Sequence, residues 1–452
     1  MKKFLLLSLI LAGSTIVSAN ARHITRHRTE GEPTVYLITV RETDTLWSNN
    51  PALAMQHPVA QRNNAVQAAI ADHHNATRLG VQQVGKPSVI FANSNNSFSF
   101  TMGGYIALRA SYGFNSTINN IDVVPFDVPV PGNYATKQKI EMDATTSRIY
   151  LRGIANTKKL GKVVLYFDAD FRGGSQGSYT PRIRSAYVSM FGLTVGRDVS
   201  TFCDLQAAPT TIDFQGPNAY NFNFSTMIRY EHSFFDKHLT IGAAAEVPTV
   251  SGTYGTTLAP IPQRMPDMPV YVQYSWGKRR ESHIRASAVF RDMYLQNLTY
   301  DTNTDLFGWG VQFSGHINFA RMFHLFFNGV YGEGITPYIQ DLTGSGLDFT
   351  PNPLDNNQAQ TMPMYGWQAA MQFDLLPNLF VSGGYSAVTV CHHNGYYATD
   401  QYKMGQYAFG NLFYSITPRF KIAAEYLWAS RKNMDSANNS ANRINFMVRY
   451  DF

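Results

Sequence analysis

The chain has 452 residues, of which 13% are aromatic and only 15% are charged, and its formal net charge is +6. Its mean hydropathy is -0.21, and no apolar run of 18 residues follows the amino-terminal segment, which excludes a membrane-spanning helix in the rest of the chain. The weak positive charge comes without a tract of lysine and arginine, which argues against a nucleic-acid-binding protein.

Residues 1–21 have the layout of a secretory signal peptide. Lys2 and Lys3 precede an apolar run that ends near Val17, and Ala19 and Ala21 form a small-x-small cleavage site. The run is too short and too polar for a membrane anchor. We expect cleavage after Ala21, which removes two lysines, lowers the formal charge from +6 to +4 and delivers the chain across the inner membrane.

Residues 22–96 are polar and irregular and predict a periplasmic extension that is partly helical or disordered. Within it, residues 33–40 are typical of a strand and residues 60–81 of a helix. Val66, Ile70 and Leu79 share one helical face, but the pattern covers fewer than three heptads. A coiled-coil stalk is therefore the less favoured alternative to a loose extension.

Residues 97–452 change to short alternating segments separated by glycine, asparagine and proline, which predicts strands. We expect sixteen of them, near residues 98–112, 145–155, 161–173, 180–190, 192–200, 224–233, 237–246, 268–277, 281–293, 305–318, 321–333, 363–375, 377–390, 402–415, 418–429 and 440–452.

The connections between these strands alternate in length. Tight turns such as residues 191–192 and 376–377 alternate with long polar segments such as residues 201–223, 334–362 and 430–439. Short periplasmic turns and long outer loops are typical of an outer-membrane barrel, whereas a large soluble β-protein gives no reason for the alternation. The fold class is therefore all-β, a 16-stranded antiparallel transmembrane β-barrel behind a periplasmic amino-terminal extension.

The last strand indicates what each face of the barrel meets. One row of its side chains is apolar to the final residue, and the other row is polar. We expect the apolar row to face lipid and the polar row to face water, the two rows being Ile444, Phe446, Val448, Tyr450 and Phe452, and Arg443, Asn445, Met447, Arg449 and Asp451.

The same alternation predicts which side chains line the interior. Arginines recur on the inner face of neighbouring strands, while Tyr187 is expected on the outer face with Ile183. Inward arginine is costly unless it is hydrated or paired, so its recurrence predicts a wet interior. These arginines either grip anionic solutes or pair with wall carboxylates and brace the barrel. The inward set is Arg148, Tyr150, Arg152, Tyr166, Asp168, Asp170, Arg172, Arg182, Arg184, Arg229, Glu231, Arg285 and Arg291.

The long segment of residues 201–223 is apolar and aromatic rather than merely polar. We expect it to fold into the barrel and narrow it, and a lid or a subunit contact is the alternative. The segment contains Cys203, and the sequence leaves open whether this thiol pairs with Cys391.

Several of these segments occur in an order that resembles the DcaP-like trimeric porins of Gram-negative outer membranes. Examples are MDATTSRIYLRG, GKVVLYFDADFRGG and the run PRIRSAYVSMFGLTVGRDVSTFCDLQAAPTTIDFQGPNA, and the resemblance extends over residues 102–341. It implies a sixteen-stranded barrel, a homotrimer and diffusion of small anionic solutes, dicarboxylates among them. The family's arginine-rich lumen matches Arg148, Arg182, Arg184 and Arg229, and Arg197, which stands where glutamine is more usual, and Asp204 complete the pore-lining candidates.

We therefore expect an outer-membrane porin for passive diffusion of small hydrophilic, preferentially anionic solutes, in contact with lipid and with its amino terminus in the periplasm. A sugar-preferring or unselective porin is the alternative, and its marker would be a ladder of inner aromatics such as Tyr150, Tyr166 and Tyr187. We expect no enzyme, no metal and no cofactor, because no G-x-S-x-G or H-E-x-x-H motif is present and the adjacent residues 391–393 (CHH) cannot converge on one ion.

Overall fold

A computed structural model of the chain describes residues 35–39, 64–75, 87, 89–93, 97–115, 121–132, 135, 137–175, 177–277, 280–320, 322–392 and 397–452. The signal-peptide prediction for residues 1–21 lies outside these ranges. Among the residues described, no helix has both the length and the apolar character needed to cross a membrane.

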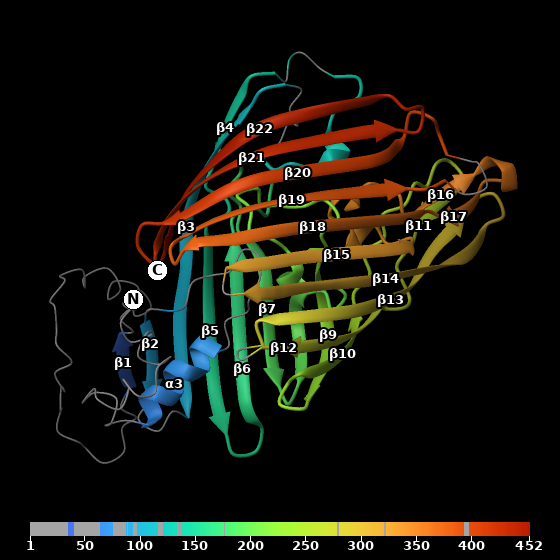
Figure 1. Ribbon diagram of the computed structural model, residues 1–452. Coiled ribbons are helices and arrows are strands. Elements are labelled where there is room, and N and C mark those ends of the chain that lie inside the picture. Colours follow the sequence, from blue (N-terminus) through green and yellow to red (C-terminus); the bar gives the residue numbers. More distant parts are fainter. Residues whose placement is uncertain are drawn as a thin grey trace, which may run out of the picture.

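Sixteen antiparallel strands close into a barrel, which confirms the predicted fold class (Figure 1). The last strand returns to the first, with register from Arg443 opposite Gly113 to Asp451 opposite Tyr105. The barrel strands are β3 (Phe98–Gly113), β5 (Arg148–Thr157), β6 (Gly161–Asp170), β7 (Arg182–Met190), β8 (Leu193–Val199), β9 (Phe224–Phe234), β10 (Leu239–Glu246), β12 (Met268–Trp276), β13 (Ser282–Asn297), β14 (Thr302–Ala320), β15 (Phe323–Glu333), β18 (Pro363–Leu376), β19 (Leu379–Val390), β20 (Tyr402–Ser415), β21 (Phe420–Asn433) and β22 (Asn438–Asp451).

Shorter elements lie in the loops. They are the strands β4 (Lys139–Asp143), β11 (Leu258–Pro260), β16 (Phe349–Asn352) and β17 (Gln358–Thr361), and the 3₁₀ turns η1 (Pro125–Asp127), η3 (Leu205–Ala207), η4 (Thr336–Tyr338), η5 (Gln340–Leu342) and η6 (Pro353–Asp355). β16 and β17 form a hairpin of their own, and β4 extends the wall by pairing with β3.

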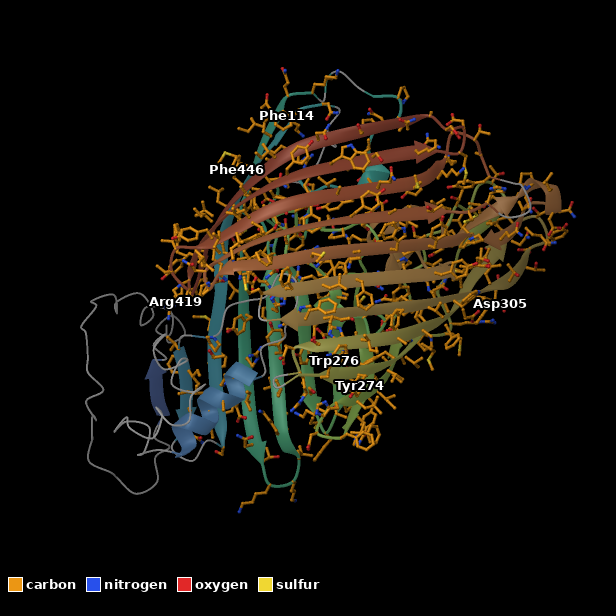
Figure 2. All side chains as sticks on the ribbon, in the orientation of Figure 1. Phe114, Tyr274, Trp276, Asp305, Arg419 and Phe446 are labelled. Carbon is orange, nitrogen blue, oxygen red and sulfur yellow. The ribbon has the colours of Figure 1, made fainter. Side chains whose placement is uncertain are left out.

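Side-chain burial follows the predicted alternation along the strands. On β22, Phe446 is 51% exposed on the outer face while Asn445 and Arg443 are buried inside. Figure 2 shows Phe446 on β22 among the side chains that cover the outside of the barrel. The two faces therefore meet different solvents, as the final strand of the sequence predicts.

The two ends of the barrel differ. One end carries short turns, such as the turn with Arg419 between β20 and β21 (Figure 2). At the same end, near the end of β12, the rings of Tyr274 and Trp276 stack with their centroids 6.0 Å apart. Asp305 marks the opposite, loop-bearing end. We call these the turn end and the loop end. Clustered aromatics at the end of an outer wall are typical of an interfacial girdle.

Two loop-end connections are shorter than the sequence indicates. β21 continues to Asn433 and β22 begins at Asn438, so the expected long loop at residues 430–439 is wrong. Residues 298–301 likewise form a short turn between β13 and β14. In both hairpins the strands continue with polar outward residues, which the apolar alternation does not reveal.

The described parts of the amino-terminal extension attach to the turn end. They are the strands β1 (Val35–Thr39) and β2 (Val89–Asn93) and the helix α3 (Asn64–Asn75). β2 pairs with β3 at residues 99–101, just beyond the point where β22 stops, and β1 pairs with β2. An edge of β3 that would otherwise be unpaired is thereby covered.

Helix α3 packs against the inner-face residues of β3, β5 and β6. Asp72 forms an ion pair with Lys162 at 2.6 Å, and the His73 ring hydrogen bonds the Ser99 hydroxyl at 3.0 Å. Arg152 donates to the backbone oxygen of His73 at 3.0 Å. A guanidinium near the carboxyl end of a helix is favoured by the exposed carbonyl dipoles. Leu79, of the proposed stalk face, lies outside the described residues.

Candidate functional site: a loop-narrowed pore

The segment of residues 201–223 folds into the barrel, as its apolar character predicts. It leaves β8 and follows the inner wall as far as β21 before it returns to β9. Its contacts with that wall are hydrogen bonds from Gln368 to the oxygen of Ala207, from the amide of Ala219 to Ser386, and from the amides of Ile212 and Asp213 to Glu425. We call this segment the constriction loop, because it occupies space that an open barrel would leave to water.

Two further loops enter the barrel, which the sequence did not indicate. Asp341 of the loop between β15 and β18 accepts hydrogen bonds from the amide of Phe126, the hydroxyl of Tyr402 and the side chain of Asn218, at 2.8, 2.6 and 3.0 Å. These donors come from the loop after β3, from β20 and from the constriction loop. One buried carboxyl group therefore joins three inward loop segments and the wall.

The pKa of Asp341 predicts how pH affects this packing. Burial raises the pKa of the Asp341 carboxyl above its ordinary value, although its donors stabilise the carboxylate. A raised pKa means that the folded form binds the proton more tightly, so the stabilising contribution is complete below the ordinary aspartate range and is lost as pH rises through the raised pKa. As pH falls from about 7.5 to about 5, the contribution of Asp341 to the free energy of unfolding should therefore increase.

Thermal unfolding in detergent at a series of pH values tests this. Asp341→Asn should change the slope of melting temperature against pH in that window, whereas Asp355→Asn, in an exposed side chain of the same loop, should leave the slope unchanged. Identical slopes for Asp341→Asn and the wild type would contradict the assignment.

Most inward arginines form ion pairs with wall or loop carboxylates. This is the second of the two roles expected from the sequence, in which the arginines pair with carboxylates and brace the barrel. The pairs are Arg148 with Asp168, Arg182 and Arg184 with Asp170, Arg172 and Arg109 with Asp122, Arg229 with Asp198, and Arg291 with Asp267 and Asp348. Arg184 is also enclosed by rings of the constriction loop, with its guanidinium 5.3 Å from the Phe214 centroid and 5.1 Å from Phe222.

Tyr187 faces the interior, contrary to the expectation. Ser185 pairs with Asp168 while Ile183 pairs with the next residue, Ala169, so Arg184 is an extra residue in β7. Such a bulge reverses the alternation beyond it. The Tyr187 ring consequently lies 5.3 Å from that of Tyr166.

Arg197 lies on the outer face, so the expectation that it lines the pore is wrong. It alternates with Asp198, which is buried against Arg229, and shares its face with Val195, which is 44% exposed. Its Nε donates to the oxygen of Ile183 at 3.3 Å. The resemblance placed this residue in the lumen, and the strand alternation places it outside.

Four of the pore-lining candidates meet around one cavity of about 220 Å³: Asp204, Arg229, Glu231 and Arg285. The cavity lies between the first residues of the constriction loop and the wall of β9, β12 and β13. This cavity is not bordered by the remaining inward candidates, which are Arg148, Arg152, Asp168, Asp170, Arg172, Arg182 and Arg184.

Arg285 differs from Arg229, the other arginine that lines this cavity. Its Nε donates to Ser287 at 3.1 Å, its Nη2 donates to the oxygen of Thr201, and its guanidinium lies 3.6 Å from the centre of the Tyr271 ring. No carboxylate pairs with it in the described part of the chain, and its Nη1 has no hydrogen-bond partner there. Arg285 thus presents a positive charge at the cavity that forms no ion pair with a carboxylate of the described residues.

The carboxylates of the cavity are held by specific partners. Asp204 is buried and accepts from His283 at 2.8 Å and from Ser314 at 2.7 Å. Glu231 accepts from the Tyr271 hydroxyl at 2.5 Å and lies 3.3 Å from Nε of Arg229. The cavity therefore contains both signs of charge in fixed positions.

Tyr271 and Gln273 are cavity residues that the sequence analysis missed. They alternate with the outward residues Val270, Val272 and Tyr274 on β12, so the inward row of that strand would have identified them. Thr201 and Cys203, from the loop, had no such signal. Both cysteines are free thiols, which answers the open question of pairing.

No group of three His, Cys, Asp or Glu side chains is arranged to hold a metal ion in the described ranges. His393 lies outside those ranges.

The comparisons with known proteins agree with this geometry. Residues 60–251 match the family model for the DcaP outer membrane protein. The outer membrane channel DcaP of Acinetobacter baumannii has a similar structure, with a TM-score of 0.69 and 21% identity over 79% of this chain and 98% of that one. The chain shares the fold of this channel, and residues 60–251 resemble the DcaP outer membrane protein family.

Other solved porins share the fold of this chain at lower similarity. An OmpF from Salmonella typhi has a TM-score of 0.53 and 12% identity, covering 79% of this chain and 99% of its own. An anion-selective porin from Comamonas acidovorans has a TM-score of 0.51 and 12% identity, covering 78% and 100%. A search of curated proteins finds no significant match. Family and fold together indicate the outer membrane of a Gram-negative cell.

Proposed function

We propose that the DcaP-like chain is a passive channel for small hydrophilic solutes with a preference for anions, dicarboxylates among them. The position of Arg285 supports the proposed preference for anions. Its guanidinium borders the cavity beside the constriction loop and has no carboxylate partner in the described residues. A guanidinium binds carboxylate oxygens through two parallel donors and remains charged at any physiological pH.

The proposal also includes the processing, the orientation in the membrane and the assembly that the sequence predicts. Residues 1–21 are removed as a signal peptide, residues 22–96 form a periplasmic extension, and residues 97–452 form the barrel as one unit of a homotrimer. The turn end, to which α3 and β2 attach, then faces the periplasm. The barrel supplies a hydrated route with weak binding, and it carries out no chemistry and needs no cofactor.

Reversal potentials across planar bilayers in a salt gradient test the anion preference. A unit charge 4 Å from a passing ion contributes about 1 kcal/mol even at the dielectric constant of water. Arg285→Gln should therefore lower the chloride-to-potassium permeability ratio by about five-fold. Arg197→Gln, which removes an arginine from the outer face, is the matched control and should leave the ratio unchanged. A cation preference in the wild type at neutral pH would reject the proposal.

A sugar-preferring channel is the second candidate, and one feature of the inner wall favours it. Tyr150, Tyr166 and Tyr187 form a row, with ring centroids 6.0 and 5.3 Å apart along the row. Arg152 lies 5.1 Å from the Tyr166 centroid and covers part of the row. Liposome swelling with neutral sugars separates the two functions, because faster entry of sugars than of monovalent anions of similar size would favour the second.

A further inference from the structure

The cavity beside the constriction loop offers its solute two opposite charges at a fixed separation. Arg285 stacks on the face of Tyr271, and Glu231 accepts from the hydroxyl of the same ring. One rigid side chain therefore sets the distance between a guanidinium and a carboxylate that both border the cavity.

Glu231 is the most accessible acid of this part of the wall. Its side chain is 35% exposed, whereas those of Asp198 and Asp204, which also carry charge here, are 1% and 2% exposed. An exposed carboxylate repels a second anion and attracts an ammonium group. A solute that places two carboxylates here meets this repulsion, whereas a solute that adds an ammonium group meets an attraction instead.

We infer that the channel selects α-amino acids, and that among dicarboxylates it prefers those that carry an ammonium group, with the solute carboxylate at Arg285 and the ammonium at Glu231. The inference rests on the proposed function, since it names the solute class of the same cavity. The cavity of about 220 Å³ equals the space of roughly seven waters at about 30 Å³ each, which suits a small amino acid.

Succinate, malate and aspartate test this inference, because they share one carbon skeleton and differ in a hydrogen, a hydroxyl and an ammonium group. Each is titrated as a blocker of chloride current through single channels in bilayers at pH 7 and equal ionic strength. A partly exposed ion pair predicts that aspartate blocks at about two- to five-fold lower concentration than succinate. Malate should match succinate.

Two variants test whether Glu231 and Arg285 cause the stronger block by aspartate. Glu231→Gln keeps an acceptor for the Tyr271 hydroxyl, and it should bring the aspartate and succinate concentrations together without weakening the block by succinate. Arg285→Gln should weaken the block by both. Glu333→Gln, the same change on β15 away from the cavity, is the matched control and should behave as the wild type.

The outcomes separate the inference from the proposed function. Equal or weaker block by aspartate in the wild type, with Arg285→Gln weakening both solutes, overturns the inference and leaves anion transport in place. A preference for aspartate that survives Glu231→Gln also overturns it. Absence of block by any of the three, together with an unchanged chloride preference in Arg285→Gln, overturns both.

Discussion

Replacing Glu425 by alanine should raise the single-channel conductance, because Glu425 holds the constriction loop against the far wall. Its two carboxylate oxygens accept the successive amides of Ile212 and Asp213, both at 2.9 Å, and Asn411 donates to it at 3.0 Å. Alanine leaves two buried amides without acceptors, at about 1–3 kcal/mol each. We expect this loss to release the loop from the wall rather than to unfold the barrel.

Conductance steps in planar bilayers measure the effect. Glu425→Gln keeps one carbonyl oxygen and should give an intermediate conductance, and Asp355→Ala, in an exposed loop side chain, should match the wild type. An unchanged conductance in Glu425→Ala, with the barrel shown to be folded by its resistance to urea, would contradict the role of the loop as the constriction.

Replacing Asp122 by alanine should cause the largest loss of stability. Asp122 is fully buried and lies between the guanidinium groups of Arg109, on β3, and Arg172, which follows β6. Removing one partner of a buried ion pair costs about 3–5 kcal/mol. After the substitution, Asp143 is the carboxylate that remains paired with both guanidinium groups. The backbone of Ile121 accepts from Arg443, so the neighbouring chain should be loosened as well.

Urea unfolding of the barrel in detergent, followed by tryptophan fluorescence, measures this loss. The double variant Asp122→Ala, Arg172→Gln removes one of the two guanidinium charges and should recover part of the stability, a coupling that a double-mutant cycle quantifies. Stability within about 0.5 kcal/mol of the wild type, the range of ordinary surface substitutions, would show that the cluster does not brace the wall.

The strands were predictable because the barrel places a different solvent on each face. Every expected strand is found in the structure, and the apolar rows around Phe446 and Ile228 lie outside as their alternation indicates. An alternation of period two needs only the local sequence and a two-sided wall. The extended hairpin of β13 and β14 was underestimated because its outward residues near Asp305 are polar.

The site was less predictable, for two physical reasons. An added residue in a strand is not visible in its composition, so the bulge at Arg184 moved Tyr187 to the inner face. The partners of each inward arginine come from distant loops, as Asp122 does for Arg172, and loop packing depends on contacts that alternation does not encode. The sequence could identify the inward charges, but not that Arg285, at the cavity, has no carboxylate partner in the described residues.

Arg285 can select among ions only if the cavity beside the constriction loop lies on their route through the barrel. Gln273 borders this cavity and Val448 points away from the barrel, so each is replaced by cysteine in a Cys203→Ser, Cys391→Ser background. A charged, water-soluble thiol reagent is then added to open channels in a bilayer. We predict a stepwise fall of current for Gln273→Cys and none for Val448→Cys. An unaltered current in Gln273→Cys after complete labelling would contradict the account.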